Sequence, residues 1–300
     1  AFLYKRLIIH TFEIKMIEES ELVLNKDGSV YHLHLRPEQV AKNIIVAGDP
    51  ARIAVISSFF DKIEHTVQHR EFITHTGWFK GELVTALCTG IGTDNIDIVL
   101  NELDTLFNID LKRREVKEEH TSLNIVRIGT SGSLQADIPE DSFVASEWGL
   151  GLDNLMHYYR VSKTPDSDKI LQHFCQHANL GDSPIRPYIF KASGKLFTHL
   201  SQGMFTGITA TAPGFYGPQG RILRLQPAFE RINEKLNSFK YNNLRITNFE
   251  METSALYGLS SLLGHNACTV CSIVANRFTR RFSKNYQLKI VVQTKESSFG

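Results

Sequence analysis

Short apolar runs rich in β-branched residues recur along the chain and predict buried β-strands. They are NIIVAG from residue 43, LVTALCTG from 83, LNIVRIG from 123, SFVAS from 142, FTGITATA from 205 and ACTVCSIV from 267. Between several of them, apolar residues recur at helical spacing, in segments 94–107, 227–236 and 251–263. Apolar strands that alternate with helices are typical of an α/β fold whose sheet is covered on both faces.

The composition is that of an ordinary globular protein, with 42% hydrophobic and 22% charged residues in a chain of 300. No stretch resembles a domain linker, a low-complexity tract or an internal repeat, so we predict one large domain. The formal net charge of +1 gives no electrostatic reason to expect binding to nucleic acid or to a membrane surface. No apolar run approaches the length of a membrane span.

The N-terminal segment is apolar in patches, but charges interrupt it and it lacks the cleavage site of a signal peptide. Met16 is a candidate start, and we assign residues 1–22 to an N-terminal extension and 23–300 to the domain. Four cysteines without framework spacing fit a reducing cytoplasm. Cys268 and Cys271 form a single C-x-x-C in an apolar run, where buried strand cysteines are favoured over a zinc site. We expect a cytoplasmic protein and assign no metal.

Glycine, small hydroxyl residues and arginine follow four of the predicted strands, at the edge where α/β folds carry their chemistry. The segments are GDPAR (48–52), TGIGTDN (89–95), IGTSGSL (128–134) and ANR (275–277). Glycines let backbone N–H groups approach an anion, and arginines offer paired donors that suit phosphate. A single arginine is more often a surface salt-bridge residue than part of a site. As a set, however, Arg52, Arg70 and Arg127 favour a convergent anion site. The sequence has no G-x-x-x-x-G-K-[ST] loop, which argues against an NTPase.

Two glutamates flank a methionine at the start of the last helical pattern, in NFEMETSALYG (248–258). A carboxylate removed from water is costly unless something binds it. Acidic residues favour a helix N-terminus, so capping is one explanation of Glu250 and Glu252. Binding of a polar substrate is the other.

Taken together, these motifs resemble the nucleoside phosphorylase family, and within it most of all the uridine phosphorylases. The matching stretches are VYHLHL (30–35), GDPAR, HREF (69–72), TGIG, RIGTSG (127–132), FYGPQGR (215–221) and NFEMET (248–253). The resemblance implies a single-domain, three-layer α/β/α fold with a central mixed sheet. It also implies a pentosyltransferase that converts uridine and phosphate to uracil and ribose 1-phosphate, in nucleoside catabolism and salvage. Inorganic phosphate would be a co-substrate, and no cofactor is implied.

The resemblance further implies two sets of site residues. The set that would bind phosphate is Gly48, Arg52, Arg127 and Thr130, with Arg70 from a neighbouring subunit. The set that would bind the nucleoside is Glu250, Met251 and Glu252 at the sugar, Phe215, Gln219 and Arg221 at the base, and the neighbour's His32 at the 5′-hydroxyl. Arg221, Gln219 and Glu252 would be the catalytic residues. The implied assembly is a homo-oligomer, either a dimer that shares active sites or a hexamer.

Elementary chemistry agrees with these roles. Phosphorolysis of an N-glycosidic bond passes through a ribosyl cation, while phosphate attacks the face opposite the departing base. Arginines that hold phosphate supply proximity, and a carboxylate on the ribose hydroxyls favours the cationic sugar. Arg221 beside the Gln219 amide would stabilise the negative charge on the leaving uracil. For Glu252, we therefore favour a role at the sugar over helix capping.

Three alternative functions are less compatible with these residues. A purine nucleoside phosphorylase is disfavoured, because purine-specific relatives carry an aspartate near the end of the last core strand, where this chain has Asn276. A hydrolytic nucleosidase needs no phosphate-binding arginines. A non-catalytic nucleoside-binding or storage protein need not retain all of the catalytic and phosphate residues.

Three segments depart from the family pattern. The charged insert 108–122 is expected to form a solvated surface loop. The chain after Arg277 is short for a lid. Asn95 stands where relatives often have serine, at a proposed monovalent-cation site near Glu71.

The alternation in VYHLHL (30–35) predicts a short strand. His32 and His34 would lie on the face opposite Leu33 and Leu35. For His34 we expect solvent exposure, whereas the resemblance places His32 across a dimer interface.

Overall fold

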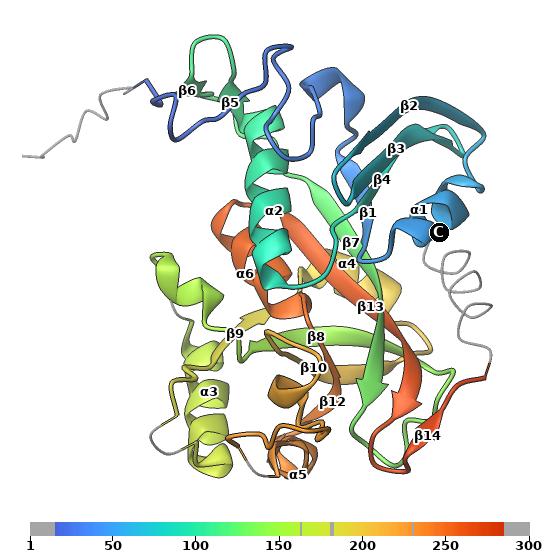
Figure 1. Ribbon diagram of the computed structural model, residues 1–300, viewed down its shortest axis with the longest axis vertical. Coiled ribbons are helices and arrows are strands. Elements are labelled where there is room, and N and C mark those ends of the chain that lie inside the picture. The colour runs from blue at the N-terminus through green and yellow to red at the C-terminus, as the bar shows by residue number, and fades with distance from the viewer. Residues whose placement is uncertain (1–15, 163, 181–182, 230, 285–300) are drawn as a thin grey trace, which may run out of the picture.

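A computed structural model describes residues 16–162, 164–180, 183–229 and 231–284 (Figure 1). The strands of its main sheet are β1 (Asn43–Ala47), β2 (Lys62–His69), β3 (Phe72–Phe79), β4 (Glu82–Cys88), β7 (Asn124–Ser133), β8 (Phe143–Gly151), β9 (Tyr188–Lys191), β10 (Phe205–Thr211), β11 (Lys240–Tyr241), β12 (Leu244–Glu250), β13 (Asn266–Asn276) and β14 (Arg281–Phe282). The α-helices are α1 (Pro50–Ser57), α2 (Thr93–Asn108), α3 (Pro165–Ala178), α4 (Gly194–Leu200), α5 (Ile232–Ser238) and α6 (Thr253–Leu262). Short 3₁₀ turns occur at η1 (Pro37–Gln39), η2 (Leu155–Tyr158) and η3 (Gly217–Gln219).

The sheet is mixed, and one half of it closes on itself. Its order is β11-β12-β10-β8-β13-β7-β1-β4-β3-β2, with β1 parallel to both β4 and β7. At the other end, β12 pairs antiparallel with the last residues of β7, so that Asn248 lies opposite Ser133. This pairing joins β7, β13, β8, β10 and β12 in a ring, and the carboxyl ends of β7, β12 and β13 converge.

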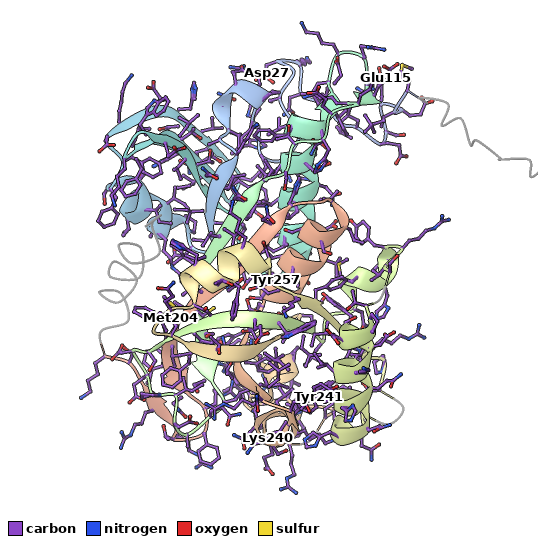
Figure 2. All side chains as sticks on the ribbon, turned by 180° about the vertical axis from the view of Figure 1, so that it is seen from behind. Asp27, Glu115, Met204, Lys240, Tyr241 and Tyr257 are labelled. Atoms are coloured by element: carbon purple, nitrogen blue, oxygen red, sulfur yellow. The ribbon has the colours of Figure 1, made fainter. Side chains whose placement is uncertain are left out.

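Helices cover both faces of the sheet because the side chains of its strands alternate between two apolar clusters. On β1, Ile44 and Val46 pack with α2 and α6, whereas Ile45 packs with Ile53 of α1. In Figure 1, α2 and α6 lie in front of the sheet, and Figure 2 shows α4 on the opposite face. The predicted three-layer α/β/α fold with a central mixed sheet is therefore confirmed.

The predicted strands are confirmed as β1, β4, β7, β8, β10 and β13. Two predicted helices are confirmed as α2 and α6. The third, 227–236, was placed too early, because the helix begins only at Ile232. Arg231 precedes it with a φ of 58°, a left-handed conformation that a continuous helix cannot contain.

The strand predicted at 30–35 is wrong. Only Val30 makes a bridge, with Leu24, and the chain then turns at 31–33. The carboxylate of Glu102, on α2, accepts the backbone N–H of His32 at 2.9 Å and that of Leu33 at 2.8 Å. These bonds stabilise a turn where the alternating pattern favoured an extended chain.

The insert 108–122 forms a small hairpin, β5 (Ile109–Asp110) and β6 (Glu115–Val116), much of it exposed to solvent. It also holds residues 16–22, the described part of the predicted extension. The Arg114 guanidinium donates to the carbonyls of Ile17 at 2.7 Å and Glu18 at 2.9 Å. Ile17 and Glu18 of the predicted extension are thus bonded to the insert. Residues 1–15 lie outside the described residues.

None of the helices within the described ranges combines the length and the apolar character that a membrane crossing requires.

Candidate active site

A cavity of about 800 Å³ lies where the ends of β1, β7, β12 and β13 converge. All the predicted site residues except His32 and Arg70 line it: Gly48, Arg52, Arg127, Thr130, Phe215, Gln219, Arg221, Glu250, Met251 and Glu252. Residues far apart in the sequence are thus brought to one place by the convergence of the strand ends.

The predicted phosphate residues meet on one side of this cavity. In GDPAR, Gly48 follows β1, and the Asp49 side chain caps α1 by accepting the Ala51 N–H at 3.0 Å. This junction places Arg52 in the first helical turn. The Arg52 guanidinium donates to the β7 carbonyl of Ile128 and to the Thr130 hydroxyl, both at 3.2 Å.

Buried donors on this side lack acceptors. The Nε atoms of Arg52 and Arg127 are buried and have no hydrogen-bond partner among the described residues. Burial, and secondarily the charge of Arg127, lowers the pKa of the Arg52 guanidinium. Unpaired buried donors and neighbouring positive charges both cost free energy, and a bound anion would relieve both.

A buried ion-pair cluster forms the floor of the cavity. Arg127 is only 4% exposed, and its Nη1 lies 3.1 Å from Oε2 of Glu250 while its Nη2 contacts Oε2 of Glu252. Burial alone would lower the pKa of Arg127, but the carboxylates of Glu252 and Glu250 outweigh burial and raise it. The guanidinium folds back over Gly129, where an added Cβ would lie 2.1 Å from Nη1. A side chain at position 129 would therefore displace Arg127.

The two glutamates have different roles. Glu250 caps α6, because its carboxylate accepts the N–H groups of Glu252 and Thr253, both at 3.0 Å, and the Thr211 hydroxyl at 2.7 Å. Glu252 makes no capping bond of its own; its Oε1 accepts the Gly92 N–H at 2.9 Å. The capping explanation therefore holds for Glu250, whereas Glu252 keeps lone pairs for a ligand.

The base-side residues lie on an irregular segment around η3. Arg221 donates from Nη1 to the Gln219 side-chain oxygen at 2.7 Å and also contacts the Phe215 carbonyl. Its guanidinium lies 3.5 Å from the centre of the Phe215 ring. Burial and the charge of Arg277 lower the pKa of Arg221 to about 10.

Arg277 is a cavity residue whose role the sequence did not reveal, although it stood in the strand-end segment ANR. Its Nη2 donates to the Gln219 carbonyl at 3.0 Å, and its buried Nη1 has no partner among the described residues. Strand β14 returns beside the end of β13 and brings Arg281 and Phe282 to the cavity. No motif predicted that contribution.

Asn276 lines the cavity, but its side chain is fully engaged elsewhere. The amide nitrogen donates to the carbonyls of Gln135 and Ile138, both at 2.9 Å. The amide oxygen accepts the N–H groups of Phe278 at 2.9 Å and Thr279 at 2.8 Å. Its hydrogen-bonding capacity is used to hold neighbouring loops.

His32 and Arg70 do not line the cavity of their own chain, but they lie close to each other. The Arg70 guanidinium lies 5.3 Å from the centre of the Tyr31 ring, which is 4.8 Å from the His32 ring. These are the two residues for which we predicted a contribution to a neighbouring subunit.

The cysteines of the C-x-x-C motif point to opposite faces of β13. Cys271 accepts a long hydrogen bond from Arg127 at 3.5 Å, whereas Cys268 packs with Leu200 of α4. They therefore do not form a chelating pair.

Asp104, His120 and His265 form a cluster of metal-ligand types at the base of the insert. The Leu123 N–H donates to Nδ1 of His265 at 3.3 Å, so the ring proton is on Nε2, 3.2 Å from Asp104 Oδ1. Nε2 of His120 donates to the Leu263 carbonyl at 2.8 Å. These contacts tie the insert to the segment that follows α6.

Residues 42–292 match the Phosphorylase superfamily, and the chain belongs to this superfamily. It is 27% identical over 278 residues to a uridine phosphorylase of Thermococcus kodakarensis, covering 90% of this chain and 86% of that protein. It is 24% identical over 250 residues to a DeoD-type purine nucleoside phosphorylase of Listeria welshimeri, covering 83% and 88%. Its fold matches that of a Trypanosoma brucei nucleoside phosphorylase that shows uridine phosphorylase activity, with a TM-score of 0.84. That structure is 30% identical and covers 92% of this chain and 98% of its own.

Proposed function

We propose that this protein cleaves uridine with inorganic phosphate to give uracil and ribose 1-phosphate. One observation carries the proposal. A single cavity places the anion-binding arginines Arg52 and Arg127 beside Glu252, with the Gln219–Arg221 pair also on its wall. Nucleophile, sugar and leaving base each have matching groups. The uridine phosphorylases among the relatives support the same reaction.

Phosphate would bind to Arg52, Arg127 and Thr130. The unpartnered Nε atoms of both arginines supply donors for its oxygens without breaking existing bonds. Held there, a phosphate oxygen is oriented toward C1′ of the ribose, and proximity of this kind supplies several kcal/mol of the barrier.

Glu252 would accept hydrogen bonds from the ribose hydroxyls. Because the carboxylate already accepts bonds from Gly92 and Arg127, its orientation is fixed before substrate arrives. Its negative charge favours the cationic sugar that forms as the glycosidic bond breaks. Met251 would lie beside the sugar, and Glu250 acts by holding the start of α6.

The C1′–N1 bond breaks with its electron pair moving to uracil, while a phosphate oxygen forms the new bond to C1′. Gln219 and Arg221 would face the uracil and stabilise its negative charge, with Phe215 beside the ring. Arg277 supports this pair because it holds the Gln219 carbonyl at 3.0 Å and adds positive charge. This preorganised charge is the type of contribution that most lowers such barriers.

A purine nucleoside is the second candidate substrate, and Asn276 argues against it. Its amide bonds to four backbone groups, so it has no donor or acceptor left for a purine ring. Purine recognition through this position would require those bonds to break.

We also propose a co-substrate, a metabolic role and a location for this enzyme. Inorganic phosphate serves as co-substrate without a further cofactor. The enzyme acts in nucleoside catabolism and salvage. Its location is cytoplasmic, which the buried thiols of Cys88, Cys268 and Cys271 support.

The decisive experiment measures products with and without phosphate. Uridine should release uracil only when phosphate is present, and the sugar product should be ribose 1-phosphate. Release at an equal rate in phosphate-free buffer, with free ribose as product, would establish a nucleosidase instead. Inosine and thymidine in the same assay report base preference.

We further propose that the active unit is at least a homodimer in which His32 and Arg70 complete the neighbour's cavity. Their proximity to each other, away from their own cavity, supports this. A chain with Arg70→Ala mixed with a chain with Glu252→Ala should regain activity, because one pocket of the mixed dimer retains both residues. If subunits exchange and no activity returns, the shared-site proposal is wrong.

A further inference from the structure

Glu102, in the middle of α2, holds the turn that carries His32. Its carboxylate accepts the backbone N–H of His32 at 2.9 and 3.1 Å and that of Leu33 at 2.8 Å. It also lies 2.7 Å from Nδ1 of the His32 ring. The Glu102 side chain is only 15% exposed, so protein groups replace most of its water.

These contacts define the tautomer of His32. An ionised carboxylate has only lone pairs to offer and can only accept hydrogen bonds. Nδ1 of His32 must therefore be the donor, and in the neutral ring Nε2 must be an acceptor. The same arrangement occurs in metal sites, where a carboxylate accepts a hydrogen bond from one ring nitrogen of a histidine and so fixes the orientation of the ring.

Neighbouring groups fix the direction of the ring. The ring of Tyr31 stands edge-on to His32 with centres 4.8 Å apart, and Nδ1 of His69 donates to the His32 carbonyl at 2.9 Å. The His32 side chain is 29% exposed. With Nδ1 held by Glu102, the opposite edge of the ring, which carries Nε2, faces away from α2.

We propose that Glu102 is a positioning residue that presents Nε2 of His32 as a hydrogen-bond acceptor for the 5′-hydroxyl of the nucleoside in the neighbouring subunit. The inference rests on the proposed function and on the shared site. Glu102 touches neither substrate nor phosphate; it acts through His32. The site would thereby prefer nucleosides with a free 5′-hydroxyl.

The kinetic test compares uridine with 5′-deoxyuridine. For uridine, Glu102→Ala and His32→Ala should each lower kcat/KM about tenfold, the effect of one lost hydrogen bond. For 5′-deoxyuridine, neither change should matter. The double variant Glu102→Ala/His32→Ala should have the same kcat/KM for uridine as His32→Ala alone, because the two residues act as one unit. Glu118→Gln, which removes an exposed carboxylate from the insert, is the matched control and should leave both substrates unaffected.

Nitrogen-15 NMR of histidine-labelled protein tests the tautomer without any turnover. His32 should carry its proton on Nδ1 in the unaltered protein. In Glu102→Gln, the amide brings a donor of its own to the ring, so the proton should move to Nε2. This variant keeps the size of the side chain and serves if Glu102→Ala fails to fold.

The outcomes separate the inference from the proposed function. If the unaltered protein does not cleave uridine, the proposed function fails, and the NMR result still decides whether Glu102 sets the tautomer. A proton on Nε2 in the unaltered protein overturns the inference. An equal loss of kcat/KM with uridine and 5′-deoxyuridine would also overturn it, as would a further loss of kcat/KM in the double variant.

Discussion

The floor and the base side of the cavity are built differently. On the floor, Arg127 and Glu252 are each 4% exposed and are bonded to each other, and Glu252 also accepts the backbone N–H of Gly92. On the base side, Gln219 is buried but Phe215 is 51% exposed, and Gln219 and Arg221 stand on an irregular segment around a single 3₁₀ turn. The floor is part of the protein core, whereas the base side is a loop segment attached to that core.

This difference suggests a division of roles, with catalytic groups on the floor and selectivity for the base on the loop. Groups at strand ends are held by the sheet, so they can be aimed at developing charge before the substrate arrives. A loop can change in sequence and shape at little cost to the core, which suits a part that reads the base. Within the superfamily, relatives named for uridine and for purine nucleosides are both similar to this chain. We therefore expect substitutions on the floor to affect folding and catalysis together, and substitutions on the loop to affect catalysis alone.

The largest effect is expected from Arg127→Ala. The change leaves Glu250 and Glu252 buried beside each other without their counter-charge, which should lower the free energy of unfolding by about 3–5 kcal/mol. Phosphorolysis should fall by about 10³-fold or more, because we propose that the same group binds phosphate. Denaturant unfolding and uridine turnover measure the two effects.

Arg245→Ala is the matched control for that prediction. Arg245 also pairs with a carboxylate through two bonds, to Asp137 at 2.8 and 2.7 Å, but that carboxylate is exposed. Loss of this exposed ion pair should lower the free energy of unfolding by about 1 kcal/mol or less. Equal destabilisation by the two variants would show that burial does not distinguish the floor.

Arg221→Ala should lower kcat for uridine by about 10²-fold, because it removes the charge that we propose faces the leaving base. The free energy of unfolding should change by less than about 1 kcal/mol, since Arg221 bonds only within its own loop in the described structure. Arg224→Ala, an exposed arginine on the same loop, is the control. A near-normal rate for Arg221→Ala would place its guanidinium away from the base.

Asn276→Asp should have the smallest effect on uridine turnover and still discriminates between the candidate substrates. The carboxylate would face the Gln135 and Ile138 carbonyls in place of a donor, which should cost about 1–3 kcal/mol of stability. Inosine cleavage should not appear. If the variant gains it, Asn276 reads the base directly and its structural role is secondary.

Several features were predictable because they depend on local pattern. The apolar runs gave the buried strands, since a strand covered on both faces has to be apolar along its length. The antiparallel strand β2 was not predicted, because it is largely exposed and carries polar residues. The turn at 31–33 was missed because its cause, Glu102, lies about seventy positions away in the chain.

The sequence by itself determined the fold class, the strand-end motifs and the family, because these reside in residue types and their local order. Only the tertiary structure decided which glutamate caps α6 and which is left for a ligand, since the partners Thr211 and Gly92 come from other elements. It also decided that the Asn276 amide is fully hydrogen-bonded and that Arg277 holds the Gln219 carbonyl. The physical reason is that hydrogen-bond partners are selected by distance in space, which neighbours in sequence do not reveal.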